Sequence, residues 1–444
     1  MKRLFGTDGI RAVAGEPPLD PETVRCFGVA LAEVLRAGSK SGRVVLGRDT
    51  RESGSWLTDA VAAGLGSRAI DGVDAGVIST PGLAHIVRSC GFDAGVMISA
   101  SHNPFQDNGL KAFGADGAKL PDSLEQRIEA LLLDHGVADP GAGGPRAAAD
   151  ATLLARYVDR LETVLPASRL RGLRVVADCA NGAACAFAPR VLEHYGAVVD
   201  AIGIEPNGRN INLGCGSLHL AALAERVRAT RADVGLAFDG DADRCLAVDA
   251  QGRVVDGDHI LFVTGTRLKR SGHLRGDALV ATIMSNFWLE ERLGREGVRL
   301  HRAPVGDKYV LEKMVAEDLV LGGEQSGHVI FREFATTGDG VLTGLLLLDA
   351  VVDGPSLDAI LDDIRPYPQE IVNVRVRAKP DLRAHPRIGP VVRRVETALD
   401  GCGRVVLRYS GTEPLARVMI EGQDATSVRR LVTELARVIE EELG

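Results

Sequence analysis

The sequence has little cysteine and no long hydrophobic run. Its 444 residues include seven cysteines, and no two of them form a C-x-x-C pair. This spacing favours reduced thiols over a disulfide framework or a zinc site. The N-terminus has no apolar run of signal-peptide length, and the most apolar segment, Val341–Val352, is too short for a membrane span and contains Asp349. We therefore expect a cytoplasmic protein without a membrane partner, in which Val341–Val352 is a buried helix.

Positive charge is not in excess either. The chain has 52 Lys and Arg residues against 60 Asp and Glu residues, a formal net charge of -8. Binding to nucleic acid usually requires a concentrated basic face, so we expect no nucleic-acid partner. A phosphorylated substrate remains compatible with this charge, because a few local arginines can hold one.

The order of apolar segments indicates several domains. The length alone predicts about two to four. Short apolar runs alternate with longer helical patterns from the strand Arg43–Gly47 onward, and the alternation restarts near residues 174 and 278, which is typical of α/β architecture. After a break at Arg365–Pro368, three short strands and a closing helix follow. The sequence thus predicts three similar α/β domains with mixed sheets and a smaller C-terminal α+β domain around a central cleft. We expect the boundaries 1–145, 146–253, 254–367 and 368–444.

The first candidate motif is Ser99-Ala-Ser-His-Asn-Pro104, which follows the apolar strand Gly95–Ile98. Open parallel sheets bind ligands at the carboxyl ends of their strands, and Ser101 with His102 would lie there. A polar turn with an Asx hydrogen bond is the structural alternative. The segment is not a G-x-S-x-G elbow, so it does not indicate a hydrolase triad.

The second motif supplies three carboxylates, Asp239, Asp241 and Asp243, after the apolar strand Val234–Phe238. In extended backbone, residues at i, i+2 and i+4 fall on one side. Three oxygens on one side suit a hard divalent cation, and we favour magnesium over calcium. An EF-hand loop would need Gly at its sixth position and Glu at its twelfth, where this chain has Arg244 and Ala250. A solvated acidic turn is the remaining alternative.

Two further motifs offer groups for a phosphorylated sugar. Gly322–His328 combines glycines, which allow close approach of the backbone, with side chains that can bind hydroxyls. Arg408–Pro414, with Arg417 just beyond, combines guanidinium and hydroxyl groups around a glycine turn, as in an anion cradle. It is not a Walker P-loop, and a hairpin turn with an exposed arginine is the alternative. The stretches Phe5–Arg11 and Asp107–Lys111 are weaker signals by themselves.

Taken together and in this order, these segments resemble the α-D-phosphohexomutase family, four-domain enzymes that move a phosphate between two positions of a sugar. The resemblance runs from Phe5 to the end of the chain. Phe5–Arg11 and Gly323–His328 are most similar to the branch that acts on glucosamine phosphate, whereas the branch for glucose and mannose phosphates tends to differ at Gln325. Ala12 departs mildly from the family, in which Gly is more usual.

The resemblance implies an isomerase that converts glucosamine 6-phosphate to glucosamine 1-phosphate through a phosphoserine and a 1,6-bisphosphate. That bisphosphate, or another hexose 1,6-bisphosphate, would activate the enzyme, and in a bacterium the product would feed cell-envelope precursor synthesis. The phosphate on Ser101 would complete a magnesium site with Asp239, Asp241 and Asp243. The implied catalytic residues are Ser101, His102, Arg11, Arg244 and, for proton transfer, Lys111. The implied substrate residues are Glu324, Ser326 and His328 for the sugar, and Arg408, Ser410, Gly411, Thr412 and Arg417 for the non-reacting phosphate.

The resemblance also gives each expected domain a role: phosphoserine, metal binding, sugar binding and phosphate binding, in chain order. Three other functions stay open from the sequence. The substrate could be a glucose or mannose phosphate. The enzyme could be a phosphatase, if water reached the phosphoserine, or the chain could be a non-catalytic phosphosugar-binding protein. A homodimer is left open as well.

Overall fold

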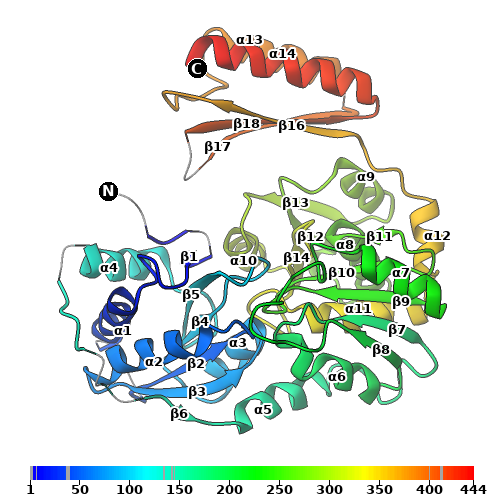
Figure 1. Cartoon of the computed structure of the whole chain (residues 1–444). Helices are drawn as coiled ribbons and strands as arrows, with labels where there is room; N and C mark the ends of the chain where they lie inside the picture. Colours follow the sequence, from blue (N-terminus) through cyan, green and yellow to red (C-terminus); the bar gives the residue numbers. More distant parts are fainter. Residues whose placement is uncertain are drawn as a thin grey trace. The chain divides into compact units, whose positions relative to one another are not determined.

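A computed structural model of the chain describes residues 4–6, 8–36, 41–133, 136–141, 144, 146–399, 401–410 and 414–444. The chain forms two compact units. The larger unit comprises Met1–Thr282 and His301–Ala359, and the smaller unit comprises Ile283–Leu300 and Ile360–Gly444. Four sheets follow one another along the described part of the chain (Figure 1).

The first sheet has six strands in the order β1-β5-β4-β2-β3-β6. Strands β4, β2, β3 and β6 run parallel, β5 pairs antiparallel with β4, and the edge strand β1 pairs antiparallel with β5. These strands are β1 (Ile10–Val13), β2 (Arg43–Arg48), β3 (Asp71–Val77), β4 (Ala94–Ile98), β5 (Asp107–Gly114) and β6 (Ala148–Ala149). The helices of this part are α1 (Pro21–Leu35), α2 (Gly54–Gly66), α3 (Thr80–Ser89) and α4 (Asp122–Leu133).

Helices cover both faces of the first sheet, and this explains its sequence. Val44 and Leu46 join one core with Phe27 of α1 and Val61 of α2. The opposite face meets α3, because a side chain at Gly95 would contact Val87 and Val45. A sheet covered on both faces needs continuous apolar runs rather than alternation, as β2 and β4 show.

The second and third sheets are also mixed. The second has the order β11-β10-β9-β7-β8, and the third has the order β13-β12-β14-β15. Helix α5 (Thr152–Leu161) packs against α3 and β3 and precedes the second sheet. The second sheet and its helices comprise β7 (Arg174–Asp178), α6 (Ala188–His194), β8 (Val198–Ile202), α7 (Ala221–Thr230), β9 (Val234–Phe238), β10 (Cys245–Asp249) and β11 (Val254–Val255). The third comprises α8 (Gly257–Arg270), β12 (Ala278–Thr282), α9 (Phe287–Arg295), β13 (Arg299–Ala303), α10 (Asp307–Ala316), β14 (Leu321–Gly323), β15 (Val329–Phe331), α11 (Gly340–Val352) and α12 (Leu357–Asp362).

The fourth sheet, in the smaller unit, is antiparallel with the order β16-β18-β17. Its strands are β16 (Gln369–Arg375), β17 (Gly403–Tyr409) and β18 (Leu415–Gly422), and its helices are α13 (Ile388–Leu399) and α14 (Ala425–Leu443). Both helices share one apolar core with the strands, and Val392, Ile420 and Leu435 lie in it. The architecture is therefore three α/β domains with mixed sheets followed by a smaller α+β domain, as the sequence predicts.

Two segments of conspicuous composition, one apolar and one glycine-rich, lie in the third domain. The apolar segment Val341–Val352 is confirmed as a buried helix, since α11 covers it. The glycine-rich segment after Leu321 connects β14 to the antiparallel strand β15 and is therefore a hairpin loop. Among the described residues, no helix is both long enough and apolar enough to cross a membrane.

The fold brings three loops of the larger unit together at strand ends. Ser101 follows β4, Asp239 follows β9, and Glu324 follows β14. Hydrogen bonds join them, since Oγ of Ser101 donates to Oδ2 of Asp239 at 2.5 Å, and Cys245 N, just after the aspartate loop, donates to Gly327 O at 3.0 Å. The carboxyl ends of strands are where open α/β sheets bind ligands.

Candidate active site

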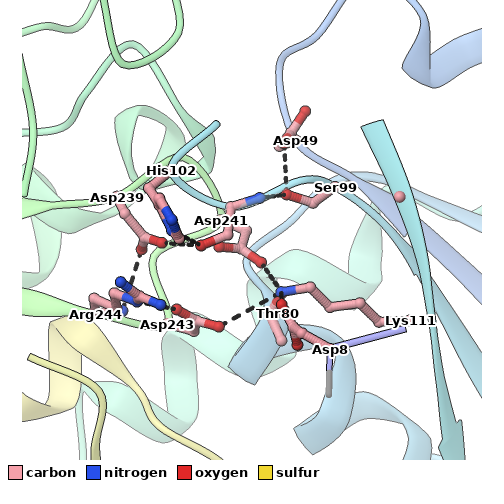
Figure 2. A network of polar contacts seen from close by, with 12 residues as sticks. Asp8, Asp49, Thr80, Ser99, His102, Lys111, Asp239, Asp241, Asp243 and Arg244 are labelled. Atoms are coloured by element: carbon pink, nitrogen blue, oxygen red, sulfur yellow. Dashed lines mark hydrogen bonds and ion pairs between the residues drawn. The ribbon is translucent and has the colours of Figure 1, made fainter. Parts of the chain in front are cut away.

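Ser101 lies in the loop after β4 and is 1% exposed. Its backbone has φ +54°, in the left-handed region that non-glycine residues rarely adopt. In this conformation, Oγ of Ser101 donates to Oδ2 of Asp239 at 2.5 Å and lies 3.1 Å from Nδ1 of His102. Figure 2 shows the imidazole of His102 beside the carboxylate of Asp239. Two of the predicted site residues thus meet Ser101 directly.

The loop of the three aspartates turns and is not extended, so the sequence-based picture of its backbone is wrong. Ala242 has φ +54°, and its N–H donates to Asp239 O at 3.0 Å. The carboxylates converge nevertheless, because one oxygen each of Asp239, Asp241 and Asp243 lies within 4.8 Å of the others. Gly240 permits the close approach of this loop to Ser101, because a Cβ there would lie 2.5 Å from Ser101 O.

The carboxylate cluster fits a divalent cation. Asp239 and Asp241 are fully buried and Asp243 is 5% exposed. Oδ1 of Asp241 and Oδ1 of Asp243 are buried and have no hydrogen-bond partner among the described residues. Burial, with the charges of Asp243 and Asp241, raises the pKa of Asp239 well above its usual value. Buried anionic oxygens require compensation, and oxygen-only ligands are those that magnesium and calcium prefer.

Lys111 supplies part of that compensation from β5. Its Nζ lies 2.7 Å from Oδ2 of Asp241, 3.0 Å from Oδ2 of Asp8 and 3.6 Å from Oδ2 of Asp243. Burial alone would lower the pKa of Lys111, but these carboxylates raise it above its usual value. Thr80 adds a hydroxyl, donating from Oγ1 to Oδ2 of Asp241 at 2.5 Å. In Figure 2, Lys111 and Thr80 both reach the aspartate loop.

Arg11 and Arg244 place positive charge beside the three aspartates. The guanidinium of Arg11 is paired with Asp8, and Nε of Arg244 lies 3.9 Å from Oδ1 of Asp243. Nε of each arginine is buried and has no hydrogen-bond partner among the described residues. Burial, followed by the charges of Arg244 and Arg11, lowers the pKa of His102 to about 4. Two unused arginine donors and a neutral imidazole beside a serine hydroxyl are suited to a phosphate.

The hairpin between β14 and β15 carries Glu324, Ser326 and His328. Glu324 is half-buried, and its Oε1 accepts from Gly306 N at 2.9 Å. Oγ of Ser326 donates to Oε2 of Glu324 at 3.3 Å. His328 lies deeper, because it is 4% exposed and its Nδ1 is 3.6 Å from Oδ1 of Asp243.

His328 therefore faces the aspartate loop. Its Nε2 lies 2.9 Å from Gly338 N and 3.5 Å from Oδ2 of Asp307. Burial alone would lower the pKa of His328, but Asp243 raises it to about 9. Glu324 and Ser326 are partly exposed, while His328 is buried beside Asp243.

The predicted phosphate residues lie in the smaller unit. Arg408 on β17 and Arg417 on β18 are direct cross-strand partners. Burial and the charge of Arg417 lower the pKa of Arg408. Ser410 closes the strand end, since its N–H donates to Leu415 O at 2.8 Å. Gly411 and Thr412 lie outside the described residues.

Three polar residues of the site are missing from the sequence prediction: Asp8, Thr80 and Lys119. Nζ of Lys119 lies 2.5 Å from Oδ1 of Asp8 and 2.7 Å from Oδ2 of Asp307. Asp8 belongs to the Phe5–Arg11 motif, so the sequence offered a reason to include its carboxylate in the site. Thr80 and Lys119 lie in no recognisable motif.

Comparisons with family models and with known proteins all indicate the same family. Four phosphoglucomutase/phosphomannomutase domain models match the chain: domain I at residues 2–136, domain II at 155–252, domain III at 256–367 and the C-terminal domain at 371–438. A phosphoglucosamine mutase of Solibacter usitatus (strain Ellin6076) is 50% identical over 444 residues, covering 100% of this chain and 99% of that protein.

Solved structures share the fold at lower identity. A phosphoglucomutase/phosphomannomutase family protein of Burkholderia thailandensis superposes with a TM-score of 0.81 at 24% identity, covering 99% of this chain and 98% of the other. An Aspergillus fumigatus N-acetylphosphoglucosamine mutase, in complex with GlcNAc-6P and magnesium, gives a TM-score of 0.68 at 18% identity, covering 100% of this chain and 96% of the other.

Proposed function

The chain belongs to the phosphoglucomutase/phosphomannomutase family, and we propose that it interconverts glucosamine 6-phosphate and glucosamine 1-phosphate. It is an intramolecular phosphotransferase of the isomerase class, like the phosphoglucosamine mutase that is 50% identical over the full length. The observation that carries the proposed chemistry is Ser101: its buried hydroxyl is hydrogen-bonded to Asp239 within a cluster of carboxylates and arginines.

The reaction we propose has two phosphoryl transfers. The hydroxyl oxygen on C1 of glucosamine 6-phosphate bonds to phosphorus as the bond between phosphorus and Oγ of Ser101 breaks. The products are the 1,6-bisphosphate and an unmodified serine, whose Oγ takes the proton of that hydroxyl. The sugar then turns over in the site. Its 6-phosphoryl group returns to Ser101, and the sugar oxygen leaves with a proton as glucosamine 1-phosphate. Both transfers need in-line geometry and charge stabilisation rather than new covalent chemistry.

The site residues divide by role in this scheme. Asp239, Asp241 and Asp243 would hold a magnesium ion, which supplies Lewis-acid stabilisation of the charge on the phosphoryl group when bound. Arg11 and Arg244 would bind the transferring phosphoryl group through their free Nε donors. Glu324 and Ser326 would bind hydroxyls of the sugar, and His328 would position Asp243. The non-reacting phosphate would be bound by Arg408, Ser410, Gly411, Thr412 and Arg417.

Lys111 and His102 have supporting roles in the proposal. Lys111 neutralises the carboxylate cluster through Asp241 and Asp8, and the resemblance names it for proton transfer. Neutral His102 shares a hydrogen bond with Oγ of Ser101 and so orients the hydroxyl. We retain the domain boundaries 1–145, 146–253, 254–367 and 368–444, a cytoplasmic location, and activation by a hexose 1,6-bisphosphate.

A panel of hexose phosphates tests the substrate. The purified chain is assayed with magnesium and a trace of glucose 1,6-bisphosphate on the 1- and 6-phosphates of glucosamine, N-acetylglucosamine, glucose and mannose. We expect the highest kcat/KM with glucosamine phosphate. An equal or higher kcat/KM with glucose 1-phosphate would favour the other branch, and release of free phosphate as the main reaction would favour a phosphatase.

A further inference from the structure

Arg51 is a buried arginine that no part of the proposed mechanism uses. It follows β2 in the loop before α2, and its side chain is 0% exposed. Its Nε donates to Oδ2 of Asp49 at 2.9 Å. A guanidinium taken out of water requires a hydrogen-bond acceptor for each of its donors, so the other partners of Arg51 indicate what it does.

The other partners of Arg51 are four carbonyl oxygens of the loop that contains Ser101. Nη2 donates to Ser101 O and to Asn103 O, each at 2.9 Å. Nη1 donates to Asp107 O at 3.0 Å and to Pro104 O. One rigid planar group thus holds the loop at four points between Ser101 and the start of β5.

Asp49 connects the same arginine to the other side of Ser101. Oγ of Ser99 donates to Oδ2 of Asp49 at 2.6 Å, and Ser101 N donates to Oγ of Ser99 at 2.9 Å. Arg51, Asp49 and Ser99 therefore fix both the N–H and the C=O of Ser101. Figure 2 shows the Asp49 and Ser99 part of this network beside the aspartate loop.

Fixing both peptide groups matters because Ser101 adopts a backbone conformation that serine disfavours. Its φ of +54° directs Oγ towards Asp239. Such conformations persist only where the surrounding structure enforces them, and they are frequent in active sites. Asn212 reinforces the arrangement, since its Nδ2 donates to Ser101 O at 2.9 Å.

We propose that Arg51 is a positioning residue for phosphoryl transfer, which holds Ser101 in its left-handed conformation so that Oγ meets the phosphoryl group in line. The inference rests on the proposed function. Arg51 touches neither substrate nor metal in this scheme and acts through the loop. Its loss should therefore slow phosphoryl transfer more than it weakens substrate binding.

The test is the rate at which Ser101 becomes phosphorylated by glucose 1,6-bisphosphate, followed by intact-mass spectrometry on folded protein with magnesium. Arg51→Lys keeps the charge but loses the planar set of donors. A displacement of about 1 Å costs roughly 100-fold in rate, so we expect phosphorylation to slow about 100-fold. The KM for glucosamine 6-phosphate should stay within about threefold of the wild-type value, because kcat falls when only the transition-state geometry is lost.

Arg48→Lys is the matched control. Arg48 lies at the end of the same strand and pairs with Asp74 at 2.7 Å, and no described contact joins its guanidinium to the Ser101 loop. The control should be phosphorylated at the wild-type rate. A wild-type rate in Arg51→Lys, or equal slowing in both variants, would overturn the inference. If the wild-type protein takes up no phosphate, the proposed function fails and the inference fails with it.

A second variant covers the case in which Arg51→Lys does not fold. Ser99→Ala removes the hydroxyl that links Asp49 to the amide of Ser101 and leaves Arg51 in place. Two hydrogen bonds of about 1 kcal/mol each are lost, so we expect phosphorylation to slow by at least about tenfold. An unchanged rate in this variant would overturn the positioning network.

Discussion

At the scale of single residues, the hydroxyl of Ser101 is the group on which the chemistry depends. Ser101→Ala removes this hydroxyl and keeps Cβ, so the loop keeps its hydrogen bonds to the backbone of residue 101. We expect no measurable mutase activity, no phosphate in the intact-mass spectrum after incubation with glucose 1,6-bisphosphate, and a thermal midpoint close to that of the wild type. Ser89→Ala, at an exposed serine that ends α3, is the control and should keep full activity. Full activity in Ser101→Ala would contradict the covalent mechanism.

The three aspartates should act as one magnesium site. Asp241→Asn keeps the size of the side chain but removes one of three buried charges, and ligand charge largely determines the affinity of such sites. We expect the magnesium concentration for half-maximal activity to rise by at least about tenfold, since changes around a metal typically cost about 10- to 100-fold in affinity. The stabilisation of the wild type by magnesium in a thermal melt should shrink in parallel. Activity that survives exhaustive chelation would contradict a metal requirement.

The sequence predicted the chemical groups of this site better than their surroundings. Ser101 and the three aspartates stand in recognisable motifs, and the structure brings them together. Thr80 could not be predicted, because its bond to Asp241 joins residues 161 positions apart and its own segment is a plain helix start. Arg51 was missed for the same reason: its four carbonyl partners are set by the tertiary fold.

At the scale of elements, the loop after β9 depends on Gly240. A Cβ there would lie 2.5 Å from Ser101 O, a backbone atom that is held in place by hydrogen bonds from Arg51 and Asn212. Gly240→Ala should therefore separate the aspartate loop from Ser101 and cost about 100-fold in kcat, the effect of a displacement near 1 Å. Steady-state kinetics measure this loss.

Gly294→Ala is the matched control for that substitution. Gly294 lies in α9, where a Cβ would meet nothing within 4 Å. Alanine in a helix is favoured over glycine by about 1 kcal/mol, so this variant should be as active as the wild type and slightly more stable to urea. Equal kinetics in both variants would show that the close approach at Gly240 is not needed.

The same loop shows where sequence reasoning about elements fails. The strand β9 has the bounds that the sequence predicts, because a strand that is buried on both faces has a continuous apolar run. The sequence predicts an extended segment between β9 and β10, whereas the structure has a turn there. Its left-handed Ala242 is stabilised from outside the loop, by Gly340 N donating to Ala242 O and by Ala183 N donating to Gly240 O. Local sequence carries no information on such donors.

At the scale of the whole molecule, the mechanism needs one phosphate-binding group that serves both substrate orientations. Arg408→Ala should then weaken glucosamine 6-phosphate and glucosamine 1-phosphate alike. A hydrogen bond to a charged group contributes about 1.5–3 kcal/mol, which corresponds to roughly 10- to 150-fold in affinity. Titration calorimetry with each monophosphate measures the change. A large loss for one substrate alone would contradict a shared phosphate group.

A measurement of thermal stability distinguishes phosphate binding by Arg408 from a purely structural role of this residue. Arg408 lies directly opposite Arg417, and like charges in that position are destabilising by themselves. Removal of Arg408 should therefore leave the thermal midpoint of the free protein unchanged or raise it, while substrate affinity falls. A lower midpoint with unchanged affinity would indicate a purely structural arginine.

The central claim is that this molecule isomerises glucosamine phosphate without releasing its phosphate. The most direct measurement is a ³¹P NMR time course of glucosamine 6-phosphate with the wild-type protein, magnesium and a trace of glucose 1,6-bisphosphate. The account predicts that an anomeric phosphate signal grows as the 6-phosphate signal declines, with their sum constant. Growth of inorganic phosphate in place of the anomeric signal, or no change at all while glucose 1-phosphate is converted under the same conditions, would contradict it.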